Sequence, residues 1–219
     1  MIRTYVILSI LLTAAALVAS LVLYPQLPAK IPIHWNIHGQ IDGYGDKSWA
    51  AFLMPAILAG LMLLFAVLPW LSPKPFAVDS FRETYWYIVL AFTGGLDFIH
   101  GLLLWAAVAG PIDITRALLA GVLLMLALIG NVLGKVRRNF WIGVRTPWTL
   151  ANERVWNDTN RLAGRLFVAA AVVGLPLLLL PLHQLALTIV VFILIMTAAL
   201  GPAIYSLVLY KRLERRGEV

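Results

Sequence analysis

The chain has 219 residues, of which 62% are hydrophobic and only 12% are charged. Soluble domains contain about 45–50% apolar and about 25% charged residues, so this composition excludes an ordinary water-soluble domain and predicts a polytopic membrane protein. The net charge of +7 then reflects the basic residues that membrane proteins keep on the cytoplasmic side, and we expect no direct contact with nucleic acid. The chain has no cysteine, which excludes disulfides, zinc–thiolate sites and thiol nucleophiles.

Six hydrophobic stretches are long enough to cross a bilayer as helices. They cover residues 4–24, 50–71, 84–109, 115–134, 164–182 and 184–210. Prolines fall in the breaks at 72–75, 110–113 and 181–183, where they interrupt a helical hydrogen-bond ladder. The sequence therefore predicts a single membrane domain, residues 1–219, of the all-α class with six transmembrane helices. Gly130 and Gly134 form a GxxxG motif of the kind that pairs helices.

The basic residues are distributed unevenly between the two sides of this six-span arrangement. One side holds only Lys30, Lys47 and Arg116. The other side holds Arg3, Lys74, Arg82, Lys135, Arg137, Arg138, Arg145, Arg154, Arg161, Arg165, Lys211, Arg212, Arg215 and Arg216. Because cytoplasmic loops carry the excess of Lys and Arg, this distribution predicts both termini in the cytoplasm. The loop at residues 25–49 is then external and the loop at 135–163 is internal.

The external loop has the pattern of a short strand followed by turns. Apolar residues alternate with other residues through 31–38, which predicts a half-buried strand. Gly39, Gly43 and Gly45 follow, together with Asp42 and Asp46, and these residue types favour turns. We therefore expect a small β-hairpin-like loop on the mouth of the helix bundle.

Polar side chains in this external loop have two open interpretations. His34 and His38 lie about 13 Å apart along a strand, so we expect no metal site there. The loop is either a structural cap with a hydrogen-bonded polar face, or a recognition surface for something outside the cell. In the second interpretation the contacts are made by His34, Trp35, Asn36 and Asp42.

The third span carries an intramembrane polar pair, Asp97 and His100, on one helix face. An unpaired carboxylate at the bilayer centre costs at least about 2.5 kcal/mol, so Asp97 needs a partner, a proton or water. Candidate partners are His100, Asn131 and Thr197. The pair is a buried polar clamp between helices, a proton- or ion-linked site, or a general acid–base group.

The internal loop has the signals of a helix that leads into the fifth span. Pro147 disfavours helix at Thr146, whereas Thr149 can cap a helix with Asn152 and Glu153 in its first turn. This predicts an internal interfacial helix. The loop serves as an interfacial anchor with topogenic charge, as a docking surface for a cytoplasmic partner, or as a functional pocket.

Both loops carry motifs that resemble those of the SdpI family, bacterial integral membrane immunity proteins against a sporulation-delaying toxin. The external motif consists of residues 31–36 with Gly39, Asp42, Gly43 and Tyr44. The internal motif consists of residues 143–149 followed by Glu153, Trp156, Asn157, Thr159, Arg161 and Gly164. The resemblance implies a multi-pass protein of the bacterial cytoplasmic (inner) membrane that protects its cell from a secreted peptide toxin. It also implies signalling, in which the toxin-bound protein holds a cytoplasmic transcriptional repressor at the membrane.

The leading hypothesis is accordingly a non-enzymatic, cofactor-free and metal-free immunity or receptor protein, whose partners are the lipid bilayer, the toxin and the repressor. The external loop would meet the toxin, and the internal loop would dock the partner. The proposed docking residues are Arg145, Thr146, Pro147, Trp148, Glu153 and Trp156.

Two other functions remain open at this level. The first is a proton- or ion-coupled transporter or channel that uses Asp97 and His100. The second is a membrane-embedded enzyme, which would need polar groups from both loops and Asp97 to converge within about 3 Å of one reacting atom.

Overall fold

The computed structural model describes residues 1–110 and 113–219. Six helices in this part of the chain are long and apolar enough to cross a membrane, which confirms the predicted class. They are α1 (Ile2–Leu23), α2 (Lys47–Val67), α3 (Arg82–Val108), α4 (Ile114–Leu133), α6 (Glu153–Leu179) and α7 (Gln184–Glu214). The short elements are β1 (Lys30–Trp35), β2 (Ile41–Asp46), α5 (Pro147–Ala151) and the 3-10 turns η1 (Tyr24–Gln26), η2 (Lys74–Phe76) and η3 (Val78–Phe81).

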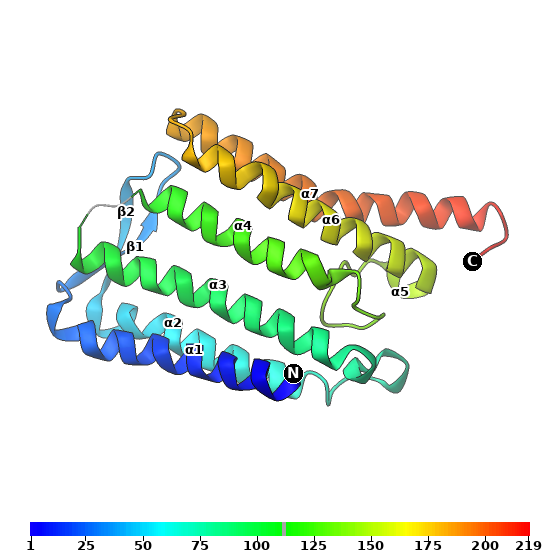
Figure 1. Ribbon diagram of the computed structural model, residues 1–219, viewed down its shortest axis with the longest axis horizontal. Helices are drawn as coiled ribbons and strands as arrows, with labels where there is room; N and C mark the ends of the chain where they lie inside the picture. Colours follow the sequence, from blue (N-terminus) through cyan, green and yellow to red (C-terminus); the bar gives the residue numbers. More distant parts are fainter. Residues whose placement is uncertain (111–112) are drawn as a thin grey trace.

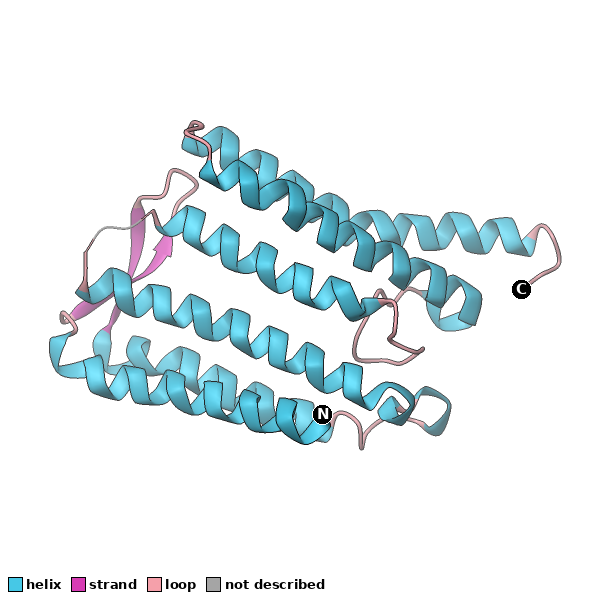
Figure 2. Ribbon diagram, in the orientation of Figure 1, coloured by secondary structure: helices cyan, strands magenta, loops and turns pink. Residues whose placement is uncertain are grey.

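The long helices lie side by side along the long axis of the molecule (Figure 1). Helix α3 packs between α1 and α4, α4 packs on α6, and α6 packs on α7. The two strands form a small sheet at one end, which we call the hairpin end (Figure 2). Both termini lie at the opposite end, together with the α2–α3 and α4–α6 connections (Figure 1). We call this the basic end, because it gathers the larger group of Lys and Arg residues.

This arrangement agrees with an even number of membrane crossings. The three remaining basic residues, Lys30, Lys47 and Arg116, lie at the hairpin end. The separation of charge that the sequence suggested is therefore a separation between the two ends of the bundle. That the basic end faces the cytoplasm stays a prediction of the positive-inside rule.

The helices hold together through three clusters of buried apolar side chains. The cluster at the basic end contains Tyr85 and Trp156, and a second, between α4, α6 and α7, contains Leu123. The third lies beneath the hairpin, where Ile31 packs with Leu104. The sheet is therefore anchored on the ends of α1, α2 and α3 by apolar burial.

Helices α4 and α6 approach closely through glycine. A Cβ atom on Gly130 would lie 2.7 Å from the carbonyl oxygen of Gly164, and a Cβ atom on Gly134 would lie 3.1 Å from the Arg161 side chain. Only glycine fits the first contact, because real Cβ atoms do not approach an oxygen so closely. The GxxxG motif thus pairs two helices of the same chain, as small residues do at membrane helix crossings.

Several helix boundaries differ from those expected from hydrophobicity. Helix α6 begins at Glu153 rather than at residue 164, because its first turns are amphipathic and their polar residues do not register as a span. The predicted cap at Thr149 is corrected: Thr146 caps α5 in a capping box with Thr149, and Asn152 caps α6. Pro147 occupies the first helical position, where its missing N–H costs nothing. The predicted break at 110–113 includes Pro111 and Ile112, which lie outside the described residues.

Candidate functional site

The hairpin is an antiparallel pair of strands with an irregular register. Lys30 pairs with Asp46 and His34 pairs with Gly43, but the register shifts on both sides of His34. The predicted alternation of buried and exposed residues is therefore only partly correct. Ile31 is 3% exposed, whereas Ile33 is 38% exposed, because Ile33 lies within the register shift between Pro32 and His34.

Asn36 shapes the turn of the hairpin. Its Oδ1 atom accepts hydrogen bonds from the backbone N–H groups of His38 (2.9 Å) and Gln40 (3.0 Å), and its own N–H donates to the Gln40 carbonyl (2.9 Å). Gly39 has a φ of +77°, a conformation that favours glycine. The amide of Asn36 is thus engaged within the turn, and we assign it a structural role there.

His34 and Asp42 come together across the hairpin. Their Nδ1 and Oδ1 atoms are 2.5 Å apart, and both side chains are exposed. Trp35 is half-buried beside them. The structure therefore brings together two of the four external-loop residues as an accessible polar pair, next to the turn that Asn36 forms.

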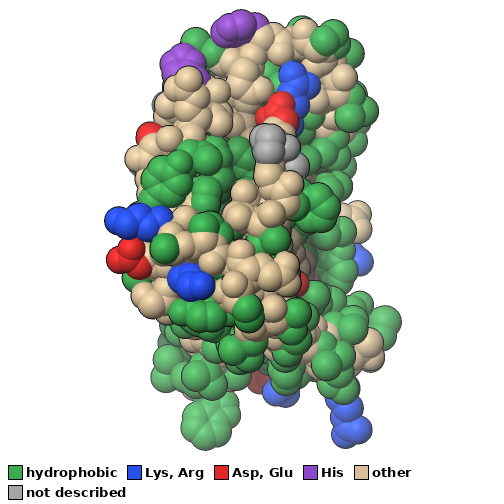
Figure 3. All heavy atoms as spheres, turned by 90° about the vertical axis from the view of Figure 1, so that its left-hand side faces the viewer, with side chains coloured by type: hydrophobic (Ala, Val, Ile, Leu, Met, Phe, Trp, Pro, Cys, Tyr) green, Lys and Arg blue, Asp and Glu red, His purple; other side chains and the backbone are tan. Residues whose placement is uncertain are grey.

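The hairpin also exposes apolar side chains that the sequence pattern did not single out as a surface. Ile33, Ile37, Ile41 and Tyr44 are 38–56% exposed. Figure 3 faces this end and shows hydrophobic and neutral atoms interrupted by only scattered charged side chains, with histidines at one edge. The period-two pattern assigned Ile33 and Ile37 to the buried face. Instead, Ile33 lies at the register shift between Pro32 and His34, and Ile37 lies in the turn beyond β1, so both are exposed.

The basic residues at the hairpin end all have partners. Lys30 forms an ion pair with Asp46, and the Lys47 ammonium donates to two backbone carbonyls. Arg116 donates to the carbonyls of Leu178 and Leu180, which are left free where α6 ends. These charges serve to fix the connections at this end.

At the basic end, buried polar side chains fold the loop of residues 135–152. Asn139 is fully buried, and its Oδ1 atom accepts from the N–H groups of Trp141 (2.7 Å) and Ile142 (2.8 Å). Its Nδ2 atom donates to the carbonyls of Arg137 (2.7 Å) and Ile142 (3.0 Å). A single side chain therefore satisfies four backbone groups of this loop.

Helix α6 completes this network from the other side. Asn160 is fully buried and accepts a hydrogen bond from the N–H group of Val144 (2.8 Å). Gly143 has a φ of +111°, and a Cβ atom there would lie 2.6 Å from the Asn160 Oδ1 atom. The internal motif thus specifies how the loop folds back on α6.

The six predicted docking residues differ in accessibility. Trp156 is fully buried and donates from Nε1 to the Val136 carbonyl (2.8 Å), so we assign it to the loop fold rather than to a partner contact. Thr146 is hydrogen-bonded to Ser206 of α7 (2.9 Å), and Trp148 is half-buried. The exposed members are Arg145, Pro147 and Glu153.

Asp97 and His100, the intramembrane polar pair, form no hydrogen bond with each other in the described part of the chain. The Nε2 atom of His100 lies 2.9 Å from Ser20 Oγ, and Ser20 donates its one proton to the Ala51 carbonyl (2.6 Å). Nε2 must therefore be the donor to Ser20, so His100 ties α3 to α1, and Ser20 links α1 to α2. Asp97 is half-buried, and within the described residues no hydrogen bond joins it to His100, Asn131 or Thr197. For His100, these contacts fit the first of the three interpretations, a buried polar clamp between helices.

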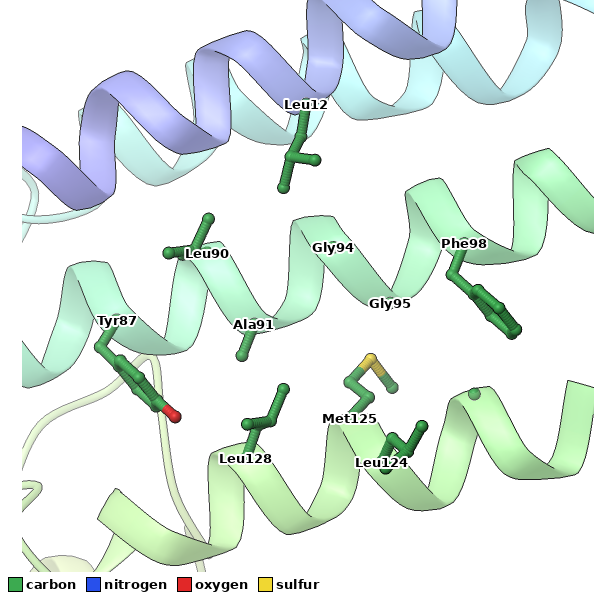
Figure 4. Close-up of a pocket in the computed structure, with 11 residues that line it drawn as sticks. Leu12, Tyr87, Leu90, Ala91, Gly94, Gly95, Phe98, Leu124, Met125 and Leu128 are labelled. Carbon is green, nitrogen blue, oxygen red and sulfur yellow. The ribbon is translucent and has the colours of Figure 1, made fainter.

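An apolar groove of about 430 Å³ lies between α1, α3 and α4 (Figure 4). Leu12, Phe98 and Met125 border it, and Gly94 and Gly95 form its floor on α3. Asp97 is not among the lining residues. The groove therefore offers apolar contact without a charged group.

A membrane-embedded enzyme would need polar groups from both loops and Asp97 to lie close together. The two loops lie at opposite ends of the bundle, so they do not meet at one reacting atom (Figure 1). In the described ranges, no group of three or more His, Asp or Glu side chains could hold a metal ion.

Comparisons with known proteins agree with the two motifs. Residues 11–59 match a domain of unknown function (DUF1648), and residues 135–206 match the SdpI/YfhL protein family. The immunity protein SdpI of Bacillus subtilis (strain 168) is 29% identical over 162 residues, which are 74% of this chain and 75% of that protein. The resemblance to the SdpI family is thereby confirmed. No solved structure matches the chain.

Proposed function

We propose that this multi-pass cell-membrane protein, a relative of the SdpI immunity proteins, makes its cell resistant to a secreted peptide toxin. This role is supported by the similarity to a protein named for immunity. The similarity covers 74% of this chain and 75% of that protein. The observation that carries the proposal is the hairpin, which combines an accessible His34–Asp42 pair with exposed apolar side chains. The toxin would bind there, with the hairpin on the outer side.

The hairpin is suited to peptide binding because its inner side is anchored while its outer side is free. Ile31 is buried against α3, so the strands keep a fixed position on the bundle. Ile37 and Tyr44 remain 50% and 56% exposed, and exposed apolar patches with polar neighbours are typical of protein contact sites. A partner would therefore meet a preformed surface.

A toxin challenge tests this proposal. Sensitive cells would express the wild type or Ile37→Ser/Tyr44→Ser at matched membrane levels, with an empty vector and Leu182→Ser as controls. Leu182 is 43% exposed at the same end but outside the hairpin. We expect resistance from the wild type and the control, and loss of resistance in the double variant. Equal sensitivity of wild-type and empty cells to the sporulation-delaying toxin would contradict the immunity role for that toxin.

We further propose that the basic end signals by holding a transcriptional repressor. The exposed Arg145, Pro147 and Glu153 form its docking surface, because a soluble partner can reach them. Transcript profiling of toxin-treated cells checks this step. An Arg145→Ala/Glu153→Ala variant should remain resistant but lose the transcriptional response of the wild type. A wild-type response in the variant would refute docking at these residues.

A further inference from the structure

A second groove, between α4 and α6 near the basic end, has both charged and apolar walls. Its volume is about 450 Å³. Its lining residues are Gly130, Asn131, Gly134, Arg161, Gly164, Arg165, Val168, Ala169 and Val172. The contact between Gly130 and Gly164 sets its depth, because two helices without side chains at their crossing leave a furrow beside it.

Charge and apolar surface are separated along this groove. Arg161 and Arg165 are one helical turn apart on α6, and Val168, Ala169 and Val172 continue from them toward the middle of the bundle. Helix α4 ends at Leu133, and Gly134 contacts the Arg161 side chain. Since α4 has about the length of a membrane crossing, Arg161 lies at the boundary of the hydrocarbon region.

The two guanidinium groups have no partner of their own in the described part of the chain. The arginine contacts found there belong to Arg82, Arg116, Arg138, Arg145 and Arg154. Arg161 and Arg165 are both exposed, on a helix face that points toward lipid beside the 66% exposed Val172. At this depth the long arginine side chains can reach the headgroup layer, where the phosphates of anionic lipids are the available partners.

We propose that this groove binds one anionic phospholipid, with its phosphate between Arg161 and Arg165 and an acyl chain along Val168, Ala169 and Val172. Guanidinium groups bind phosphate oxygens in pairs of parallel hydrogen bonds, which the spacing of the two residues allows. The continuous apolar wall favours a lipid over a soluble phosphate, because a soluble ion would leave that wall without a partner. This inference does not depend on the immunity role.

Lipid binding to the purified protein tests the proposal. Native mass spectrometry in a neutral detergent would compare palmitoyl-oleoyl phosphatidylglycerol with phosphatidylcholine of the same chains. We expect the wild type to prefer the anionic lipid. The Arg161→Gln/Arg165→Gln variant should bind it about thirtyfold more weakly, which is about five- to sixfold per lost arginine. Arg212→Gln/Arg216→Gln is the matched control, since it removes the same charge at the same spacing near the C-terminus, outside the groove. Size-exclusion profiles would establish that all variants are folded.

Two further measurements separate a lipid site from general surface charge. Ala169→Phe fills the apolar wall but keeps both arginines, and it should also weaken binding of the anionic lipid. Glycerol 1-phosphate should compete poorly, because it has no acyl chain. Equal losses in the groove variant and the control, unchanged binding by Ala169→Phe, or full competition by glycerol 1-phosphate would each overturn the proposal.

Discussion

The hairpin and the basic-end loop use the same device in different surroundings. Asn36 and Asn139 each accept two backbone hydrogen bonds within their own loop. Asn36 is partly exposed at the tip of the hairpin, whereas Asn139 is fully buried beneath the loop of residues 135–152. Water can replace the hydrogen bonds that Asn36 accepts from the backbone, but it cannot reach those of the buried Asn139. The two loops therefore differ: the buried side chain of Asn139 holds the basic-end loop in its fold, whereas the hairpin leaves exposed side chains around Asn36.

This difference explains why a polar motif is a poor guide to contact residues. Trp156 belongs to the internal motif, and Asn160 binds the motif residue Val144. Both side chains are fully buried, so they act on any partner only through the shape of the loop. At the hairpin the accessible side chains include apolar ones, such as Tyr44. Substitutions should accordingly affect stability at the basic end and recognition at the hairpin.

The largest effect on stability is expected from Asn139→Ala. It removes a fully buried side chain and leaves the N–H groups of Trp141 and Ile142 and the carbonyls of Arg137 and Ile142 without that partner. Each buried polar group without a partner costs about 1–3 kcal/mol, so we expect a loss of about 3 kcal/mol or more. Thermal unfolding in detergent and proteolysis of the loop would measure it. A melting curve like that of the wild type would show that water reaches this site.

Gly143→Ala should be the next most destabilising change. Its φ of +111° is strained for alanine, and the added Cβ atom would lie 2.6 Å from the Asn160 Oδ1 atom. We expect a loss of about 2 kcal/mol. Gly60→Ala in α2 is the matched control, since a Cβ atom there meets nothing within 4 Å. Similar unfolding curves for the two variants would refute the close contact.

The sequence predicted local features well and long-range contacts poorly. Hydrophobic runs and turn glycines predicted the six spans and the hairpin, because each signal is contained in a few consecutive residues. The exposure of Ile33 could not be predicted, because it depends on a register shift between two strands. The burial of Asn160 depends on the loop folding back on α6, and the partner of His100 lies on another helix.

Asn36→Ala should have a smaller effect than Asn139→Ala, although it also removes two backbone hydrogen bonds. The freed N–H groups of His38 and Gln40 lie in the exposed part of the hairpin and can bond to water. We expect a loss of about 1 kcal/mol, which parallel thermal unfolding of both variants would measure. A loss as large as that of Asn139→Ala would mean that the hairpin is as closely integrated in the fold as the basic-end loop.

The smallest effect on stability is expected from Asp42→Asn. The His34–Asp42 pair is short, but the two side chains are 70% and 44% exposed, and exposed ion pairs contribute about 0–1 kcal/mol. The unfolding curve should therefore stay close to that of the wild type, while toxin resistance falls if this pair contacts the toxin as we propose. Arg154→Gln provides the control, because it breaks an equally exposed pair with Glu218 at the other end.

If Asp42→Asn keeps full resistance with an unchanged fold, the polar pair is not a contact, and the proposed recognition surface is reduced to its apolar side chains. If it instead unfolds the protein, the hairpin is a structural element like the basic-end loop, and the contrast between the two regions disappears.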